Sequence, residues 1–457
     1  MSSIPSGQPI EADDTVDKVH HVRIWPSTLS GTIRVPGDKS LSHRALMLGA
    51  MVGTEVPVSG VANSGDVAAT ARALRSMGVK VDLERPSDGS LSGTVLGPVR
   101  EPADVVDCGN SGTSLRLLAG VAAGIAGLTV LTGDASLRRR PVDRVRAPLS
   151  EMGITTWARN DGALPPLAIV GGQPRAVEYL SPVASAQVKS CVVLAGLRAD
   201  GTTTVISPAP SRDHTERMLR HLGGRVVRTI MEDGAERVEI TPCELRAAPI
   251  DVPGDPSTAS FWIVAAVIAA TSVAITVPAV LVNTTRTGFL AVLRSMNASV
   301  EQAEARDVGG EPVADITARP SSLTGASVSG PAVVDAIDEL PILALAGMVS
   351  REGLDVTDAQ EMRVKESDRI QATVDALGAL GVTAEERPDG YRVPGGQRPR
   401  SGVVDANGDH RIAMTAAIAA TIADGPVDIM GFSTVASSYP GFLRDLRALG
   451  GRYEVIA

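Results

Sequence analysis

The chain has 457 residues, too many for one compact core, so we expect about two to four domains. Its net charge of −9 argues against a nucleic-acid-binding protein, and no apolar run reaches the roughly 18 residues of a membrane-spanning helix. The three cysteines (Cys108, Cys191 and Cys243) are isolated, which fits neither a metal-binding motif nor a disulfide framework and is typical of buried thiols in a reducing compartment.

The N-terminal residues 1–21 combine clustered acidic residues with little periodicity, and we expect a flexible tail there. The acidic residues are unlike an organelle transit peptide, and the segment lacks the apolar core of a secretion signal. We therefore expect the protein to stay in the cytoplasm.

The segment Val35–Ala50, V-P-G-D-K-S-L-S-H-R-A-L-M-L-G-A, is typical of a turn followed by an amphipathic helix. The Pro-Gly pair at its start ends an extended run over 31–35. We expect Ser40 or Ser42 to cap the helix, because serine hydroxyls accept hydrogen bonds from the free N–H groups of a first turn.

Two cations, Lys39 and Arg44, would lie near the N-terminus of this helix, where the free N–H groups and the helix dipole favour an anion. The segment therefore predicts a binding site for phosphate or carboxylate. One alternative is an ordinary capped helix with solvated charges. A nucleotide P-loop is rejected, because the G-x-x-x-x-G-K-[ST] spacing is absent and Asp38 would repel phosphates.

An amphipathic helix pattern that ends in an aliphatic residue and then Gly or Asn, the residues typical of a left-handed C-cap, occurs six times. The ends are Met77-Gly78, Met152-Gly153, Leu222-Gly223, Met296-Asn297, Leu380-Gly381 and Leu449-Gly450. Successive ends lie roughly 70 to 85 residues apart, which is too long for solenoid repeats and fits a βαβαββ unit.

A second, more apolar helix follows a polar turn in each unit, and an all-round apolar helix is typical of a buried position. The turns are Gly37–Ser40, Gly109–Thr113, Ser185–Lys189, Gly254–Ser257, Asp338–Pro341 and Gly408–Arg411. We predict an α/β (α+β) fold of six βαβαββ units in two domains of three units each. The seam is expected near Pro249–Gly254, and the first strand, near Arg23–Val35, is expected to pack with the C-terminal half.

Basic residues lie in or just after most of these turns, so that six helix N-termini and their cations could converge on one cleft. These residues are Lys39, Arg44, Arg116, Arg140, Lys189, Arg212, Lys365, Arg369 and Arg411. Of the run Arg138–Arg140, we expect only one side chain to point inward. The carboxylates grouped with the cations are candidates for proton transfer, although Glu366 could equally form a plain helix ion pair with Arg363 or Arg369. They are Asp338, Glu339 and Glu366.

Eight motifs, in chain order, resemble 5-enolpyruvylshikimate-3-phosphate synthase, an enolpyruvyl transferase. They are Val35–Ala50, G-N-S-G-T (109–113), R-P (140–141), S-A-Q-V-K-S (185–190), S-R-D-H-T-E (211–216), I-D-E-L-P-I (337–342), R-V-K-E-S-D-R (363–369) and D-H-R-I-A-M (409–414). The resemblance implies two domains that close over a cleft, one formed by 37–251 and the other by 22–36 plus 252–457. It also implies that the enolpyruvyl group of phosphoenolpyruvate is transferred to the 5-hydroxyl of shikimate 3-phosphate.

The resemblance further implies the roles of the site residues. Asp338 would accept the proton of the 5-hydroxyl, and Glu366 with Lys39 would handle the proton at the methylene carbon. Shikimate 3-phosphate would be held by Lys39, Ser40, Arg44, Ser185, Gln187, Arg212, Asp338 and Lys365. Phosphoenolpyruvate would be held by Lys39, Gly112, Arg140, Gln187, Arg369 and Arg411. The reaction implies no metal and no cofactor, and we expect a monomer that glyphosate inhibits at the phosphoenolpyruvate site.

Two positions depart from the family pattern: Ser185-Ala186 stands where a pair of serines is common, and no lysine precedes Tyr439-Pro440. A rival interpretation is UDP-N-acetylglucosamine enolpyruvyl transferase, which carries a reactive cysteine in a flexible loop. The equivalent loop here, Leu131–Pro141, has no cysteine. A scaffold protein without activity is the other alternative, but it would not need so many like charges close together.

Overall fold

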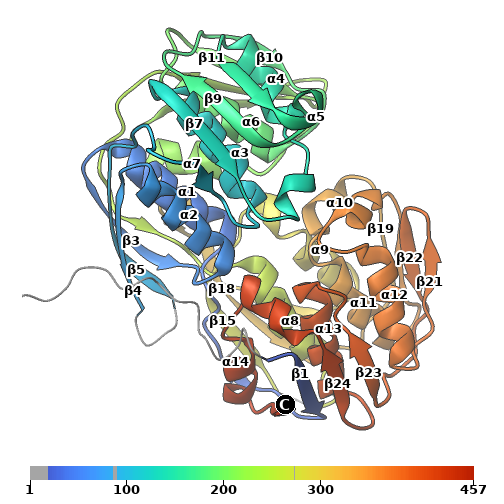
Figure 1. The fold of residues 1–457 in the computed structure, drawn as a ribbon. Coiled ribbons are helices and arrows are strands. Elements are labelled where there is room, and N and C mark those ends of the chain that lie inside the picture. The colour runs from blue at the N-terminus through green and yellow to red at the C-terminus, as the bar shows by residue number, and fades with distance from the viewer. Residues whose placement is uncertain (1–18, 86–89, 272, 457) are drawn as a thin grey trace, which may run out of the picture.

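The computed structural model describes residues 19–85, 90–271 and 273–456 (Figure 1). Most of the predicted tail, residues 1–18, lies outside the described residues. The tail ends earlier than expected, because Val19 is buried and His21 begins strand β1 (His21–Trp25).

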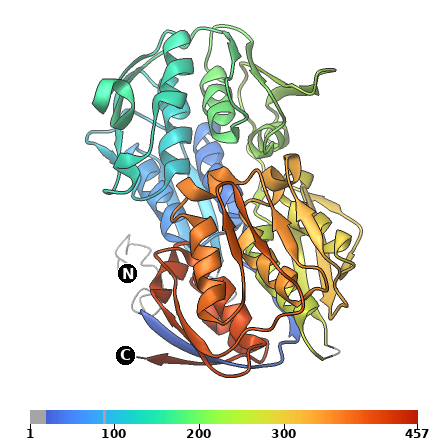
Figure 2. The same ribbon diagram turned by 90° about the vertical axis from the view of Figure 1, so that its right-hand side faces the viewer.

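The described residues form two lobes, each around a hydrophobic core of its own (Figures 1 and 2). One core takes its side chains from 41–252, with Leu281 added, and the other from 19–35 and 259–449. Aromatic residues make up only 2% of the chain, so small aliphatic side chains fill most of both cores. An exception lies in the second lobe, where the rings of Trp262 and Phe442 stack with their centroids 4.9 Å apart.

Among the described residues, the N-terminal lobe holds three sheets of one topology. In each, counted in spatial order, the first two strands are parallel and the third lies antiparallel between the second and the fourth. In spatial order the strands are β14 (Ile250–Asp251), β3 (Glu55–Val61), β5 (Leu91–Leu96) and β4 (Lys80–Glu84); β6 (Val106–Asp107), β7 (Gly127–Thr132), β9 (Leu164–Gly171) and β8 (Thr155–Ala158); and β10 (Glu178–Leu180), β11 (Thr203–Ser207), β13 (Glu236–Thr241) and β12 (Arg225–Ile230). The helices are α1 (Lys39–Val52), α2 (Gly65–Ser76), α3 (Gly112–Ala123), 3₁₀ helix η1 (Leu137–Arg139), α4 (Asp143–Glu151), α5 (Arg159–Gly162), α6 (Ala186–Gly196) and α7 (His214–His221).

The described part of the C-terminal lobe repeats this topology in three more sheets. The strands are β2 (Gly31–Thr32), β15 (Ile275–Leu281), β18 (Glu311–Arg319) and β16 (Ser299–Gln302), with β17 (Arg306–Val308) beside β18; β19 (Ala326–Val328), β20 (Leu354–Val356), β22 (Gly390–Val393) and β21 (Glu385–Arg387); and β23 (Gly402–Asp405), β24 (Val427–Met430), β1 and β25 (Arg452–Ile456). The helices are α8 (Pro256–Ile268), η2 (Thr284–Arg286), α9 (Gly288–Ser295), α10 (Pro331–Ala336), α11 (Leu340–Val349), η3 (Gln360–Val364), α12 (Arg369–Ala379), α13 (His410–Thr421), η4 (Phe432–Ser437) and α14 (Phe442–Ala448). In the described segments, no helix combines the length and the apolar character needed to cross a membrane.

The predicted fold of six βαβαββ units is confirmed in the described residues. Each unit contains a buried helix, namely α1, α3, α6, α8, α11 or α13, as the apolar patterns predicted. The residue after each predicted helix end has a positive φ, between 62° and 103°. These residues are Gly78, Gly153, Gly223, Asn297, Gly381 and Gly450.

Two short strands exchange places between the lobes. β2 precedes α1 in the chain but pairs with β15 of the C-terminal lobe, and β14 precedes α8 but pairs with β3 of the N-terminal lobe. The two crossing segments contact each other: the N–H of Asp38 donates to the carbonyl of Pro253 at 2.8 Å, and the N–H of Asp255 donates to that of Pro36 at 2.9 Å. The first buried helix of each lobe therefore begins directly beside the other.

The start of α1 differs from the prediction. Asp38, rather than Ser40 or Ser42, is the N-cap, because its Oδ1 accepts the N–H of Leu41 at 2.8 Å. Ser42 instead donates from its hydroxyl to the carbonyl of Asp38 within the first turn, at 2.8 Å. The extended run expected over 31–35 is also shorter, since strand pairing is confined to β2.

A glycine is required at the crossing. Gly37 pairs with Gly254 in an isolated antiparallel β-bridge. A Cβ atom on Gly37 would lie 1.8 Å from the carbonyl oxygen of Gly60. Because that oxygen belongs to the backbone, it cannot swing away, and we expect Gly37→Ala to lower the free energy of unfolding by about 3 kcal/mol.

Chemical denaturation of Gly37→Ala and of Gly378→Ala measures this effect. Gly378 lies inside α12, and a methyl group added there would have no heavy atom within 4 Å, so its variant should be neutral or more stable by up to about 1 kcal/mol. Equal midpoints for the two variants would contradict a close-packed crossing.

Candidate active site

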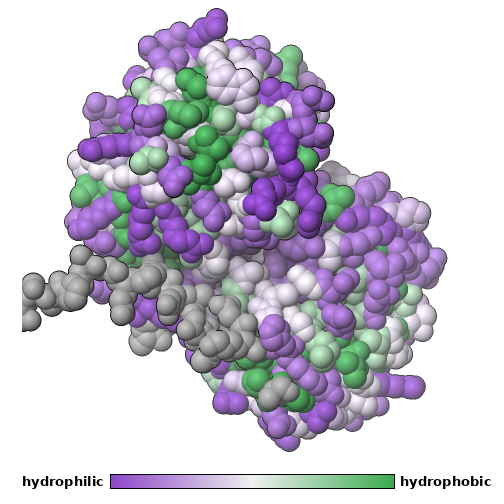
Figure 3. Space-filling model, viewed as in Figure 1, coloured by the Kyte–Doolittle hydropathy of each residue, from purple (hydrophilic) through white to green (hydrophobic). Residues whose placement is uncertain are grey.

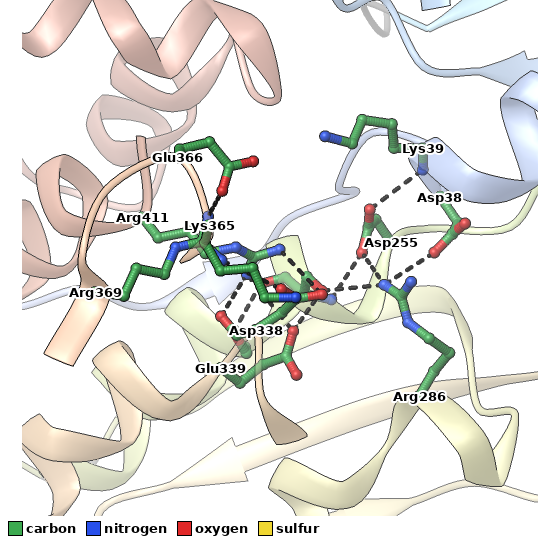
Figure 4. A network of polar contacts seen from close by, with 12 residues as sticks. Asp38, Lys39, Asp255, Arg286, Asp338, Glu339, Lys365, Glu366, Arg369 and Arg411 are labelled. Carbon is green, nitrogen blue, oxygen red and sulfur yellow. Dashed lines mark hydrogen bonds and ion pairs between the residues drawn. The ribbon is translucent and has the colours of Figure 1, made fainter. Parts of the chain in front are cut away.

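The polar turns before the buried helices meet at the junction of the lobes, where Figure 3 shows a recess in the surface. Two hydrogen bonds cross the junction. The N–H of Lys39 donates to Oδ2 of Asp255 at 3.2 Å, and Nη2 of Arg212 donates to Oδ2 of Asp338 at 3.0 Å. Residues that are distant in sequence, from turns and helix starts of both lobes, are thereby brought into one polar network (Figure 4).

Asp338 is the centre of a cluster of arginines. Its Oδ1 lies 3.2 Å from Nη1 of Arg369, and its Oδ2 lies 4.0 Å from Nη2 of Arg411. Arg411 also donates from Nη1 to the main-chain carbonyl of Asp338 at 2.7 Å. Because Arg212 belongs to the N-terminal lobe and the other two arginines to the C-terminal lobe, one carboxylate receives cations from both sides of the junction.

Arg369 contacts three carboxylates, one of which is Asp338. It is 1% exposed, and besides Asp338 it contacts Glu366, with Nη2 2.6 Å from Oε2, and Asp409, with Nε 2.8 Å from Oδ2. Asp409 is also the N-cap of α13, since it accepts the N–H of Arg411 at 2.9 Å. The helix ion pair that the sequence left open for Glu366 is therefore present, but its arginine also contacts Asp338.

The surrounding cations keep both candidate acid–base groups ionised. Burial alone would raise the pKa of Asp338, but the cations around it, Arg411 foremost, outweigh burial and hold that pKa well below its usual range. Burial would likewise raise the pKa of Glu366, but its pKa is lowered to about 2, chiefly by Arg369. In the absence of ligand, both side chains are therefore carboxylates at neutral pH.

Lys39 brings a cation from the first turn of α1 to the same place. Its Nζ lies 3.1 Å from Oδ2 of Asp66 on α2. Burial alone would lower the pKa of Lys39, but Asp66 and, across the junction, Glu366 outweigh it and raise that pKa. Lys39 is therefore protonated and lies within electrostatic range of a carboxylate in the other lobe.

Gln187 connects the helices α3 and α6 of the N-terminal lobe. Its Oε1 accepts from Nη1 of Arg116 at 3.0 Å, and its Nε2 donates to the hydroxyl of Thr113 at 3.2 Å. Gly112 begins α3 beside them, and a Cβ atom there would lie 2.7 Å from Nη1 of Arg116. The absence of a side chain at Gly112 thus leaves room for the arginine at this turn.

The other predicted residues of the recess are placed as follows. Of Arg138–Arg140 the first two are exposed, whereas Arg140 is half-buried and donates from Nη2 to Oδ1 of Asn110 at 2.7 Å. Ser185 is the N-cap of α6. Lys365 is half-buried, with Nζ 3.6 Å from the nearest carboxylate oxygen of Glu361.

Arg44 points into the N-terminal lobe. Its Nε donates to the hydroxyl of Thr215 at 2.7 Å, its Nη2 to that of Ser190 at 3.0 Å, and its Nη1 to the carbonyl of Ser40 at 2.9 Å. Burial lowers its pKa to about 10, which still leaves the guanidinium charged at neutral pH. Arg44 therefore braces the first turn of α1 from behind.

The inclusion of Lys189 among the cations of the cleft was wrong. The residue is 1% exposed, and its Nζ lies 2.7 Å from Oε1 of Glu216 and 2.8 Å from Oε2 of Glu236. A buried ammonium needs such partners, and both come from segments distant in sequence. The lysine thus follows a polar turn but belongs to the interior of the N-terminal lobe.

Residues in or behind the site that sequence reasoning missed include Asp409, Asp66 and His43. Asp409 had a usable signal, because an aspartate directly before a buried helix is typical of an N-cap. Asp66, which pairs with Lys39, had none. His43 was also missed: its Nδ1 lies 2.6 Å from the hydroxyl of Thr70, which lies 2.5 Å from that of Ser114, so this chain of contacts joins α1, α2 and α3.

Comparison with known proteins agrees with this geometry. The family model described as EPSP synthase (3-phosphoshikimate 1-carboxyvinyltransferase) matches residues 25–446. The chain belongs to the EPSP synthase family. The resemblance inferred from the eight motifs is thereby confirmed.

Relatives within this family are similar over almost their whole length. The chain is 45% identical to the 3-phosphoshikimate 1-carboxyvinyltransferase of Gloeobacter violaceus, over 92% of this chain and 96% of the relative. It is 47% identical to the protein of the same name from Halorhodospira halophila, over 95% and 97%. The structure of EPSP synthase from Acinetobacter baumannii superposes with a TM-score of 0.86 at 38% identity, over 96% of this chain and all of that one.

His43 makes the stability of this EPSP synthase family member depend on pH. Burial lowers its pKa from 6.5 to about 4, so the unfolded chain binds this proton at a higher pH than the folded protein does. The stabilisation associated with neutral His43 is complete above pH 6.5 and falls by about 1.4 kcal/mol per pH unit toward pH 4. Denaturant unfolding of His43→Asn across this range should show a correspondingly flatter pH profile than wild type, and parallel profiles would contradict the assignment.

Proposed function

We propose that this chain transfers the enolpyruvyl group of phosphoenolpyruvate to the 5-hydroxyl of shikimate 3-phosphate and releases phosphate. Membership of the family supports this reaction, since the curated relatives are named 3-phosphoshikimate 1-carboxyvinyltransferases. The observation that carries the proposal is the cluster at Asp338, where arginines of both lobes surround one ionised carboxylate. Such a cluster suits two anionic molecules bound side by side.

The charge of the two substrates explains the number of cations. Two phosphates and two carboxylates bring a charge of about −5 to −6 into the recess. Each charge-assisted hydrogen bond contributes roughly 1.5–3 kcal/mol, so several cations are needed to outweigh repulsion and desolvation. Since the whole chain carries a net charge of −9, these local cations must also overcome the repulsion of the protein for an anion.

Shikimate 3-phosphate would bind mainly against the N-terminal lobe. The proposed contacts are Lys39, Ser40, Arg44, Ser185, Gln187, Arg212, Asp338 and Lys365. Arg44 has three N–H groups directed at protein acceptors, which leaves two of its five for a ligand. Its first role is therefore to hold the turn that carries Ser40.

Phosphoenolpyruvate would bind between the lobes. The proposed contacts are Lys39, Gly112, Arg140, Gln187, Arg369 and Arg411. Among the described residues, the buried Nε of Arg411 has no hydrogen-bond partner, which is consistent with a donor that a ligand completes. Glyphosate would compete at this site, because Gly112 leaves the turn without a methyl group.

The two proton transfers fall to carboxylates whose basicity depends on the bound anions. Asp338 would accept the proton of the 5-hydroxyl, and Glu366 with Lys39 would move the proton at the methylene carbon. In the free site, cations hold the pKa of Asp338 well below its usual range. Phosphate and carboxylate groups bound to the same arginines would offset that effect and make Asp338 a better base.

The site is proposed to act on small molecules only, in a monomer in the cytoplasm. The acidic net charge supports the absence of a nucleic-acid partner. Within the family fold, both lobes needed for the recess come from this one chain, which supports a monomer.

Phosphate release tests the proposed function. The purified protein is incubated with phosphoenolpyruvate and one acceptor, either shikimate 3-phosphate or UDP-N-acetylglucosamine. We expect phosphate release only when shikimate 3-phosphate is the acceptor, because the loop 131–141 has no cysteine for the reaction with UDP-N-acetylglucosamine. Release with the UDP-sugar and none with shikimate 3-phosphate would overturn the proposal.

Replacing Asp338 by asparagine tests its role as a base. Asp338→Asn keeps the shape and hydrogen bonding but loses the basicity, so kcat should fall about 100-fold or more while shikimate 3-phosphate still binds. Calorimetric binding and steady-state kinetics separate the two effects. Asp375→Asn, at an exposed position of α12, should behave as wild type. Equal losses of binding and rate in Asp338→Asn would indicate a structural role instead.

A further inference from the structure

Arg286 is a buried cation that the reaction described above does not use. It ends η2 and is 5% exposed. A single nitrogen of its guanidinium, Nη2, lies 3.1 Å from Oδ2 of Asp38, 3.1 Å from Oδ1 of Asp255 and 3.0 Å from the hydroxyl of Ser257. Figure 4 shows Arg286 at one end of the polar network, with Arg411 at the other.

The first branch of contacts leads to Lys39. Asp38 and Asp255 are the N-caps of α1 and α8, the helices that begin where the two chain segments cross between the lobes, a point called the double crossover from here on. Asp255 uses its second oxygen, Oδ2, to accept the N–H of Lys39 at 3.2 Å. Arg286 therefore holds together the turns that precede α1 and α8. Lys39, the first residue of α1, reaches the recess from this place.

The second branch leads to Arg411. The hydroxyl of Ser257 accepts from Arg286 and donates to Oε1 of Glu339, and this oxygen lies 3.6 Å from Nη1 of Arg411. The same nitrogen of Arg411 donates to the carbonyl of Asp338. Arg286 thus connects, through one serine and one glutamate, to a cation of the C-terminal lobe.

The charge of Arg286 is secure in this position. Burial alone would lower its pKa, but Asp38 and Asp255 outweigh burial and raise it. Removal of the guanidinium would leave the two carboxylates buried without this partner, which is costly.

We propose that Arg286 is a positioning residue for phosphoenolpyruvate: from the double crossover it fixes Lys39 of one lobe relative to Arg411 of the other. This inference rests on the proposed function, in which both cations hold phosphoenolpyruvate. Arg286 acts through Asp255 on one side and through Ser257 and Glu339 on the other, without contacting the substrate. Shikimate 3-phosphate should be affected less, because its proposed contacts Arg44 and Ser185 lie outside this path, although Lys39 is shared by both substrates.

Steady-state kinetics of four variants test the proposal: Arg286→Met, Arg286→Lys, Ser257→Ala and the control Arg294→Met. Arg294 is an exposed arginine on the neighbouring helix α9. We expect the KM for phosphoenolpyruvate to rise at least ten-fold in Arg286→Met and at least five-fold in Ser257→Ala. Arg286→Lys should recover part of the loss, and in all variants the KM for shikimate 3-phosphate should change less than three-fold. Arg294→Met should match wild type.

A merely structural role would lower the amount of active enzyme, and therefore the apparent kcat, without moving the KM for phosphoenolpyruvate. A KM within two-fold of wild type in folded Arg286→Met overturns the proposal. If circular dichroism shows that Arg286→Met is unfolded, Ser257→Ala decides in its place, because it keeps both Arg286–aspartate pairs and interrupts only the path to Glu339. If the wild-type protein releases no phosphate with phosphoenolpyruvate and shikimate 3-phosphate, the proposed function is refuted, and the inference with it. If the wild type is active and the variants keep its KM for phosphoenolpyruvate, only the inference is refuted.

Discussion

The pairing of Asp338 with arginines of both lobes is the interaction on which the site depends. Arg212 approaches this carboxylate from the N-terminal lobe, and Arg369 and Arg411 approach it from the C-terminal lobe. Cations this close together repel one another, so they can be held in one recess only with anions between them. In the free protein the anions are side chains, with Glu366 and Asp409 on Arg369 and Asp66 on Lys39. In the proposed reaction, substrate phosphates and carboxylates take over part of this role, which releases Asp338 to act as a base.

The repeated unit explains how the chain concentrates these charges. Each unit places a buried helix behind a polar turn, and the double crossover brings the first such helix of each lobe to the same point. The turns that hold Lys39 and Asp255 are therefore neighbours, although the residues are 216 positions apart in sequence. Close packing of backbone at Gly37 and the buried charge of Arg286 keep this geometry in place. The fold thus determines the distance between cations that belong to different lobes.

Local rules were enough to predict the fold, because its signals recur along the chain. Apolar periodicity located the buried helices, and a Gly or Asn after each amphipathic helix, such as Gly78 or Asn297, marked its end. The site residues were reached through motifs rather than geometry, so their orientation could not be predicted. Lys189 lies on α6 close to Gln187, yet its partners Glu216 and Glu236 lie inside the lobe. The cap of α1 was predicted to be a serine, although Asp38 carries the same local signal as Asp409; the structure adds that the second oxygen of Asp38 faces Arg286, which is distant in sequence.

The central claim is that anionic substrates replace side-chain carboxylates as the bridge between cations of the two lobes. Small-angle scattering of the protein alone, with shikimate 3-phosphate, and with shikimate 3-phosphate plus glyphosate tests it most directly. The account predicts that the radius of gyration decreases when ligand is added and that Arg212→Met, which lacks the cation facing Asp338 from the N-terminal lobe, shows a smaller decrease. An unchanged radius of gyration in wild type, at ligand concentrations shown by calorimetry to saturate the site, would contradict it.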